Sequence, residues 1–193
     1  ADAAFTGATP GLPPAPLLGV VSLSSPPPLV RRSHPSPSLR PTASHRLASA
    51  LFPYLPERSM PRGDLVAKLL REWGGPRWPD PAALALYRRA VQVPFAAHSA
   101  LEQVRWLYRS PVRADGARHA QALRNAPAVP TLQVHGESDG CYSVSRSMAD
   151  GAVARQLGAQ YRFEMLSGAG HYLPEEEPDR VSALLRGWLA ELG

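Results

Sequence analysis

The sequence has 193 residues, enough for one domain or one domain with a small appendage. Its apolar fraction of 44% and charged fraction of 19% argue against wholesale disorder. A single cysteine, Cys141, excludes an internal disulfide framework and a cysteine-rich zinc module, and we expect no cofactor and no metal. No run of about 18 apolar residues occurs, so we expect no membrane span. The chain starts at Ala1 with no secretory leader, which predicts a cytoplasmic protein.

The net charge of +5 raises the possibility of a nucleic-acid partner. Lys68 is the single lysine, and the arginines are scattered rather than gathered into a basic arm. No recognised nucleic-acid motif accompanies them, so we expect no nucleic acid among the partners.

The amino-terminal third is rich in proline and carries one candidate strand. Thirteen of the 22 prolines precede residue 63, where they interrupt nearly every possible helix. The short apolar run at 17–23 lies between Pro16 and Pro26, which is typical of a buried strand in a parallel sheet. Residues 24–61 then predict a long irregular segment.

The middle of the chain predicts a small all-helical block. Asp64 and Asp80 stand where helices over 64–73 and 82–91 would be capped, and Ser99 and Glu102 have capping-box spacing for a third helix. A shorter fourth helix is expected at 116–124.

The last third alternates strands and helices. A strand is predicted at 130–136, a helix at 143–157 that breaks near Gly151, a strand at 161–165 and an amphipathic helix that begins at Pro178. This order is typical of the end of an α/β sheet with a helical block inserted before it.

The two predicted strands end in loops that could carry chemistry. Asp139 follows the first strand and His171 follows the second, and reacting groups of open parallel sheets collect at this edge. An aspartate there would hold the imidazole in one tautomer, which leaves the other ring nitrogen to act as a base. Asp139 and His171 are therefore the candidate catalytic residues.

The sequence over 132–139 and 168–176, with the 32-residue spacing of Asp139 and His171, resembles the carboxyl-terminal half of an α/β-hydrolase. The resemblance implies an α/β fold: the C-terminal part of the parallel sheet, with an inserted helical cap. It implies a sheet segment at 1–29 (a helix tail and one strand), a cap at 30–125 and the core at 126–193. The nucleophile and the oxyanion hole of the family are not found in this chain, and the resemblance puts them upstream of Ala1.

One pattern offers a different nucleophile. Residues 136–140, Gly-Glu-Ser-Asp-Gly, match the G-x-S-x-G pattern of a nucleophile elbow, with Ser138 at its centre. Such an elbow precedes its acid and histidine, and too little chain follows Ser138 for that order. We therefore expect Asp139 to be the acid and Ser138 to be its neighbour by accident.

The cap resembles that of epoxide-hydrolase-like members of the family. In those enzymes cap tyrosines polarise the epoxide oxygen, which implies Tyr108, Tyr87 and Tyr54, with Trp106, as substrate-binding residues. Packing of Trp106 and Tyr108 within the cap is the competing interpretation. Serine esterases and haloalkane dehalogenases share the same second half.

The functional prediction is hydrolysis of a small organic substrate, an epoxide or an ester, by water that the His–Asp pair activates. The alternatives are a catalytically incomplete remnant of the fold and an interaction protein. The expected partners are a small-molecule substrate and a second copy of the chain, which would associate through an exposed sheet edge. The remaining histidines lack metal-ligand spacing, and we expect Cys141 to be a buried thiol. We expect Glu175 to Glu177 to stabilise the start of the last helix, where the helix dipole is positive.

Overall fold

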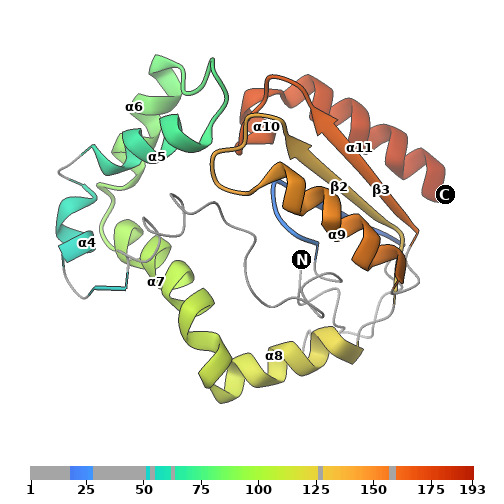
Figure 1. Cartoon of the computed structure of the whole chain (residues 1–193). Coiled ribbons are helices and arrows are strands. Elements are labelled where there is room, and N and C mark those ends of the chain that lie inside the picture. Colours follow the sequence, from blue (N-terminus) through green and yellow to red (C-terminus); the bar gives the residue numbers. More distant parts are fainter. Residues whose placement is uncertain (1–17, 28–50, 53–54, 62–63, 126–127, 157–159) are drawn as a thin grey trace.

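The structure is a computed structural model that describes residues 18–27, 51–52, 55–61, 64–125, 128–156 and 160–193. Three parallel strands form a sheet in the order β1 (Val20–Leu23), β2 (Thr131–Gly136) and β3 (Tyr161–Leu166). Because all three run in the same direction, their carboxyl ends meet at one edge. The fold is thus α/β with a parallel sheet, as the sequence predicts (Figure 1).

The helices that flank this sheet follow β2 and β3 in the chain. They are α9 (Val144–Gln156), α10 (Leu173–Glu176) and α11 (Pro178–Leu192). Figure 1 shows α9 and α11 on opposite sides of the sheet.

One face of the sheet holds the main hydrophobic core. β2 is buried along its whole length, and Leu132 and Val134 pack with Leu173 and with Trp188 of α11. Each of these side chains is at most 3% exposed, and burial of one such side chain contributes about 1.5–3 kcal/mol. This packing explains why the spacing of apolar residues in the last helix is regular: one stripe of α11 covers the sheet.

The other face of the sheet packs against α9. Gln133 accepts a hydrogen bond from the hydroxyl of Tyr161 on the neighbouring strand (2.6 Å). The helix continues through Gly151, so the predicted break there is wrong. A Cβ on Gly151 would lie only 2.5 Å from the ring of Tyr161, which is too close for a side chain. Gly151 therefore serves close packing of helix and strand and does not end the helix.

The helical block lies between β1 and β2 in the chain. Its elements are α4 (Leu55–Ser59), α5 (Leu65–Trp73), α6 (Pro81–Ala90), α7 (Ala96–Arg109), a short 3₁₀ helix (Ser110–Val112) and α8 (Ala114–Asn125). Asp80 caps α6 as predicted, since its side chain accepts the Ala83 N–H (2.7 Å). Asp64 precedes α5 but makes no capping bond. α7 begins three residues before Ser99, so the expected capping box is not the start of this helix.

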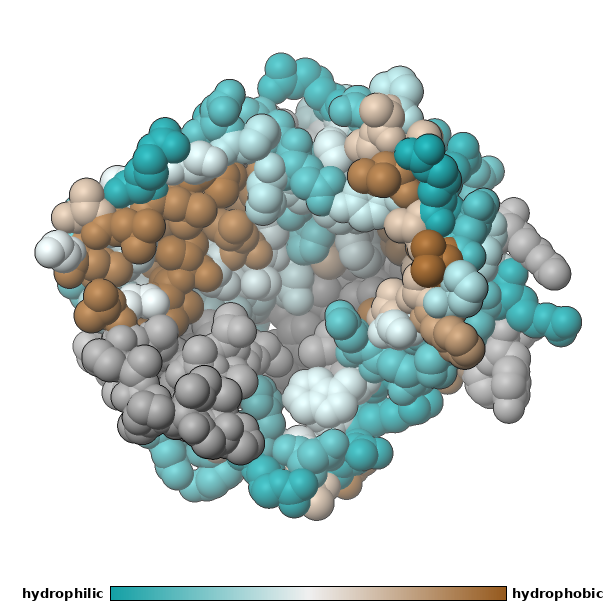
Figure 2. Space-filling model, turned by 180° about the vertical axis from the view of Figure 1, so that it is seen from behind, coloured by the Kyte–Doolittle hydropathy of each residue, from teal (hydrophilic) through white to brown (hydrophobic). Residues whose placement is uncertain are grey.

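β1 is less buried than the sequence predicts. Val20, Val21 and Leu23 are only partly buried, because β1 pairs with β2 on one side and is the edge strand of the described sheet. Seen from behind, hydrophobic residues gather on the side of the molecule that carries the sheet and α11 (Figure 2). Leu18 and Leu189 are both 66% exposed. The element order agrees with a block inserted between two sheet segments, while the boundaries at 29/30 and 125/126 stay predictions.

None of the described helices combines the length and the hydrophobicity that a bilayer crossing requires.

Candidate active site

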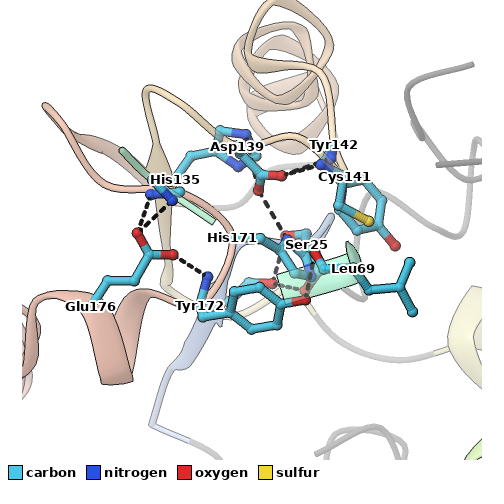
Figure 3. A network of polar contacts seen from close by, with 12 residues as sticks. Ser25, Leu69, His135, Asp139, Cys141, Tyr142, His171, Tyr172 and Glu176 are labelled. Atoms are coloured by element: carbon cyan, nitrogen blue, oxygen red, sulfur yellow. Dashed lines mark hydrogen bonds and ion pairs between the residues drawn. The ribbon is translucent and has the colours of Figure 1, made fainter. Parts of the chain in front are cut away.

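The structure brings the two predicted catalytic residues into contact. Asp139 lies in the loop after β2 and His171 in the loop after β3, at the carboxyl edge of the sheet (Figure 3). The distance between His171 Nδ1 and Asp139 Oδ2 is 3.0 Å. Neighbouring parallel strands therefore place residues that are 32 positions apart in the sequence within hydrogen-bond distance.

Both carboxylate oxygens of Asp139 are held in place. The side chain is fully buried, and Oδ1 accepts the backbone N–H groups of Cys141 (2.7 Å) and Tyr142 (2.9 Å). Oδ2 faces His171 and also lies 3.7 Å from His135 Nε2. The loop turns sharply after Asp139, so that its own backbone N–H groups bind the carboxylate. These bonds fix the direction from which Asp139 meets the imidazole. His135, at the end of β2, is a fully buried neighbour of the acid.

Aromatic rings surround His171. Tyr142 stacks on the imidazole with ring centroids 5.8 Å apart, while Trp73 and Tyr172 meet it edge-on at 5.6 and 5.3 Å. The His171 side chain is 20% exposed. The ring is thus confined by packing but is still open on one side, which suits a group that exchanges protons.

The helical block is tied to both loops by one carbonyl group. The Trp73 carbonyl oxygen, at the end of α5, accepts the N–H of Gly140 (3.2 Å) and the N–H of His171 (2.9 Å). Gly140 can come this close because it has no side chain: a Cβ there would lie 1.8 Å from the Glu72 carbonyl oxygen. The carboxyl end of α5 is therefore part of the framework that sets the spacing between acid and base.

Two other groups beside the pair are unsuited to ionise. Burial, together with the nearby Asp139, raises the pKa of the Cys141 thiol well above its ordinary value. Burial also raises the pKa of Tyr172, whose hydroxyl donates to the Leu69 carbonyl (3.4 Å). Cys141 is thus the buried thiol that the sequence predicts, and the Tyr172 hydroxyl contacts α5 of the helical block.

The predicted substrate-binding residues lie in different surroundings. Tyr87, on α6, donates its hydroxyl hydrogen to Glu175, and its pKa is raised to about 12 by burial and by that carboxylate. Tyr108, on α7, is 36% exposed, and its pKa is raised by partial burial and by electrostatic interaction with Cys141. Trp106 on α7 meets the ring of His119 on α8 edge-on at 5.5 Å, which is a contact within the helical block. Tyr54 lies outside the described residues.

The serines at the sheet edge have different environments. Ser138 is exposed in the turn after β2, and its N–H donates to the Ala169 carbonyl (2.9 Å). α9 begins only at Val144, so Ser138 does not stand on a strand–turn–helix elbow. Ser24, after β1, is 3% exposed and has a φ of 51°, a left-handed backbone that is uncommon for serine. Among the described residues, no group of three or more histidine, cysteine, aspartate or glutamate side chains is arranged so that it could hold a metal ion.

Two contributors at this edge were missed by the sequence analysis. Trp73 acts through its backbone carbonyl, a group that every residue has, so no sequence signal could have found it. Glu176 accepts hydrogen bonds from the backbone on both sides of His171. An acidic residue five positions after the histidine could have been recognised as a contributor. The sequence analysis instead assigned the whole acidic run to the positive end of the last helix.

Comparison with known proteins relates the chain to a fold. The sequence matches no protein-family model, and a search of curated proteins gives no significant match. Solved structures do match. A protein from Klebsiella pneumoniae assigned as an epoxide hydrolase is 21% identical with a TM-score of 0.65, over 96% of this chain and 61% of its own. One from Pseudomonas aeruginosa with the same assignment is 25% identical with a TM-score of 0.65, over 91% and 58%. A haloalkane dehalogenase loop variant from Bradyrhizobium elkanii is 17% identical with a TM-score of 0.64, over 91% and 60%.

These matches extend over most of this chain but over less than two thirds of each neighbour. The neighbours are hydrolases by name, and the sheet that this chain contributes to the match consists of three parallel strands. The chain therefore has the α/β-hydrolase fold and corresponds to part of it.

Proposed function

We propose that this protein takes part in hydrolysis of a small organic substrate and that Asp139 and His171 activate the water. The observation that carries the proposal is the 3.0 Å contact between His171 Nδ1 and Asp139 Oδ2. Because the backbone amides of Cys141 and Tyr142 hold the other carboxylate oxygen, the imidazole meets a fixed acceptor. A fixed acceptor keeps the proton on Nδ1 and leaves Nε2 as the base.

The chemical step follows from this tautomer. Nε2 takes a proton from water while the water oxygen forms a bond to the electrophilic carbon of an ester. The imidazolium, stabilised by Asp139, then returns that proton to the departing alkoxide oxygen when the carbon–oxygen bond breaks. In an epoxide-hydrolase-like cycle the same water would cleave an ester formed with an aspartate nucleophile.

Epoxides are the substrate class we favour over simple esters. Two of the structural neighbours bear the epoxide-hydrolase assignment. Tyr108 also supports this choice, because it is 36% exposed, interacts electrostatically with Cys141 of the acid loop, and has a hydroxyl that can donate to an epoxide oxygen. Tyr87 is a weaker candidate, since its hydroxyl is already bound to Glu175.

Hydrolysis of an aryl epoxide and of a p-nitrophenyl ester tests the proposal. Loss of a positioned general base typically costs about 10²–10⁴ in rate, so we expect His171→Ala to lose turnover by that factor. His98→Ala is the matched control, because His98 lies on α7 with its side chain 56% exposed and its Nδ1 3.7 Å from Glu57 Oε1. Equal turnover by the wild type, His171→Ala and His98→Ala would overturn the proposal.

A second pair of variants tests the substrate class. Tyr108→Phe removes one hydroxyl, and we expect it to slow epoxide opening while ester hydrolysis keeps its rate. Tyr87→Phe is the matched control for loss of a cap hydroxyl. If Tyr108→Phe affects both substrates equally, the epoxide assignment is wrong although the hydrolytic pair is retained.

A further inference from the structure

Glu176 is the acceptor at the centre of a cluster of backbone N–H groups. Its Oε2 accepts from Gly170 (2.7 Å) and Gly75 (2.9 Å), and its Oε1 accepts from Tyr172 (2.8 Å). The side chain extends from α10 toward the loop that carries His171 (Figure 3). One carboxylate thus joins three main-chain groups from two segments about one hundred residues apart.

These hydrogen bonds fix the backbone on both sides of His171. Gly170 and Tyr172 are its two neighbours, and the His171 N–H itself donates to the Trp73 carbonyl (2.9 Å). Three consecutive amides of the loop are therefore fixed, two of them by Glu176. Since the side chain leaves the backbone at the middle one, fixing all three sets the direction in which the imidazole points.

The two segments that Glu176 joins are packed backbone against backbone. A Cβ on Gly170 would lie 2.1 Å from the Gly75 nitrogen, and a Cβ on Gly75 would lie 2.6 Å from Glu176 Oε2. No side chain fits between them, so glycine is required at both positions for this approach. A shift of Glu176 would consequently move the loop and the cap together.

The flanking glutamates have other partners. Glu175 accepts from the Tyr87 hydroxyl, and Glu177 accepts from the Arg77 guanidinium (2.9 Å). Both contacts are with side chains of the helical block, whereas those of Glu176 are with the backbone around the base. The acidic run therefore divides into one residue aimed at the His171 loop and two aimed at cap side chains.

We propose that Glu176 is a positioning residue for His171, which holds the imidazole at hydrogen-bond distance from Asp139. This inference rests on the proposed function, because it assigns Glu176 a task only if the pair is the working acid and base. All three partners of Glu176 are donors. Replacement by glutamine turns one acceptor oxygen into an NH₂ group and so leaves at least one amide facing a donor.

The test compares Glu176→Gln with Glu177→Gln, a glutamate of the same run that contacts the Arg77 side chain. The first measurement is the nuclear magnetic resonance signal of the His171 Nδ1 proton, which a hydrogen bond to a carboxylate shifts downfield. The second is hydrogen exchange of the Gly170 and Tyr172 amides, followed well below the unfolding temperature of each variant. Glu176→Ala serves as a second variant, and circular dichroism checks that each protein is folded.

We expect Glu176→Gln to broaden or lose the His171 signal and to speed exchange of both amides by about tenfold, whereas Glu177→Gln keeps the wild-type values. On a hydrolysed substrate, kcat should fall while KM stays the same, since the base and not the binding surface is displaced. A retained His171 signal in folded Glu176→Gln and Glu176→Ala would overturn the positioning role and leave the proposed function intact. A wild-type protein without this signal would overturn both.

Discussion

Replacement of Asp139 by asparagine is the most direct perturbation of the candidate site. The asparagine carbonyl can still accept from the amides of Cys141 and Tyr142, as Oδ1 of the carboxylate does. Its NH₂ group then takes the place of Oδ2, which lies 3.0 Å from His171 Nδ1 and 3.7 Å from His135 Nε2. An acceptor between two imidazoles is thus replaced by a donor.

The expected magnitudes follow from these contacts. The hydrogen bonds of a charged carboxylate, worth about 1.5–3 kcal/mol each, become hydrogen bonds of a neutral amide, worth about 0.5–1.5 kcal/mol each, so the free energy of unfolding should fall by about 2 kcal/mol. The His171 proton should move from Nδ1 to Nε2, because Nδ1 must now accept. That tautomer has no free base at Nε2, and turnover should fall by about 10³–10⁴.

Two measurements on the same variant check this reasoning. The ¹⁵N shifts of His171 report its tautomer, and urea unfolding reports the loss of stability. Asp115→Asn is the control, since Asp115 is an aspartate in an exposed ion pair with Arg113 and its loss should leave the urea midpoint nearly unchanged. An Asp139→Asn protein that keeps the Nδ1 proton and the wild-type midpoint would refute the assigned contacts.

Two further predictions concern Tyr87 in the helical block and the glycines. Since burial and Glu175 raise the pKa of Tyr87 from 10 to about 12, the protonated form is favoured in the folded state. The contribution of Tyr87 to stability is therefore complete below pH 10 and is lost as the pH rises to 12, a loss that Glu175→Gln should reduce in denaturant titrations at each pH. Gly170→Ala should destabilise the protein by about 1–3 kcal/mol, because its Cβ would overlap the Gly75 backbone. Gly187→Ala, in α11 with open space around it, should stabilise by about 0.5–1 kcal/mol in thermal unfolding, and the reverse order would contradict the packing described.

The elements near the site were predictable because their signals are local. The strand before Asp139 was expected at 130–136 and is found at Thr131–Gly136, bounded by a proline and a glycine. The meeting of Asp139 and His171 followed from one rule, that neighbouring parallel strands end at the same edge. The N-cap at Asp80 was equally local, since a short acceptor before a proline favours a helix start.

The errors arose where a tertiary contact decides what a residue does. Gly151 was interpreted as a helix breaker, but the ring of Tyr161 requires a glycine there and the helix continues. Ser99 had capping-box spacing, yet α7 starts earlier because the backbone turns at Phe95, where φ is 65°. The task of Glu176 depends on Gly75, about one hundred residues away, and no local pattern contains that distance.

The carbonyl of Trp73 has a consequence for how this part of the protein can vary. A main-chain oxygen is the same for every amino acid, so residue 73 can change its identity without removing the acceptor that Gly140 and His171 share. Adding or deleting one residue between the end of α5 and Gly75 would instead displace that oxygen and release both loops. An insertion or deletion at this junction should therefore disturb the shared acceptor more than a substitution at residue 73, which would remove only the ring contact with His171. For this shared carbonyl, the number of residues in the segment matters more than the identity of residue 73.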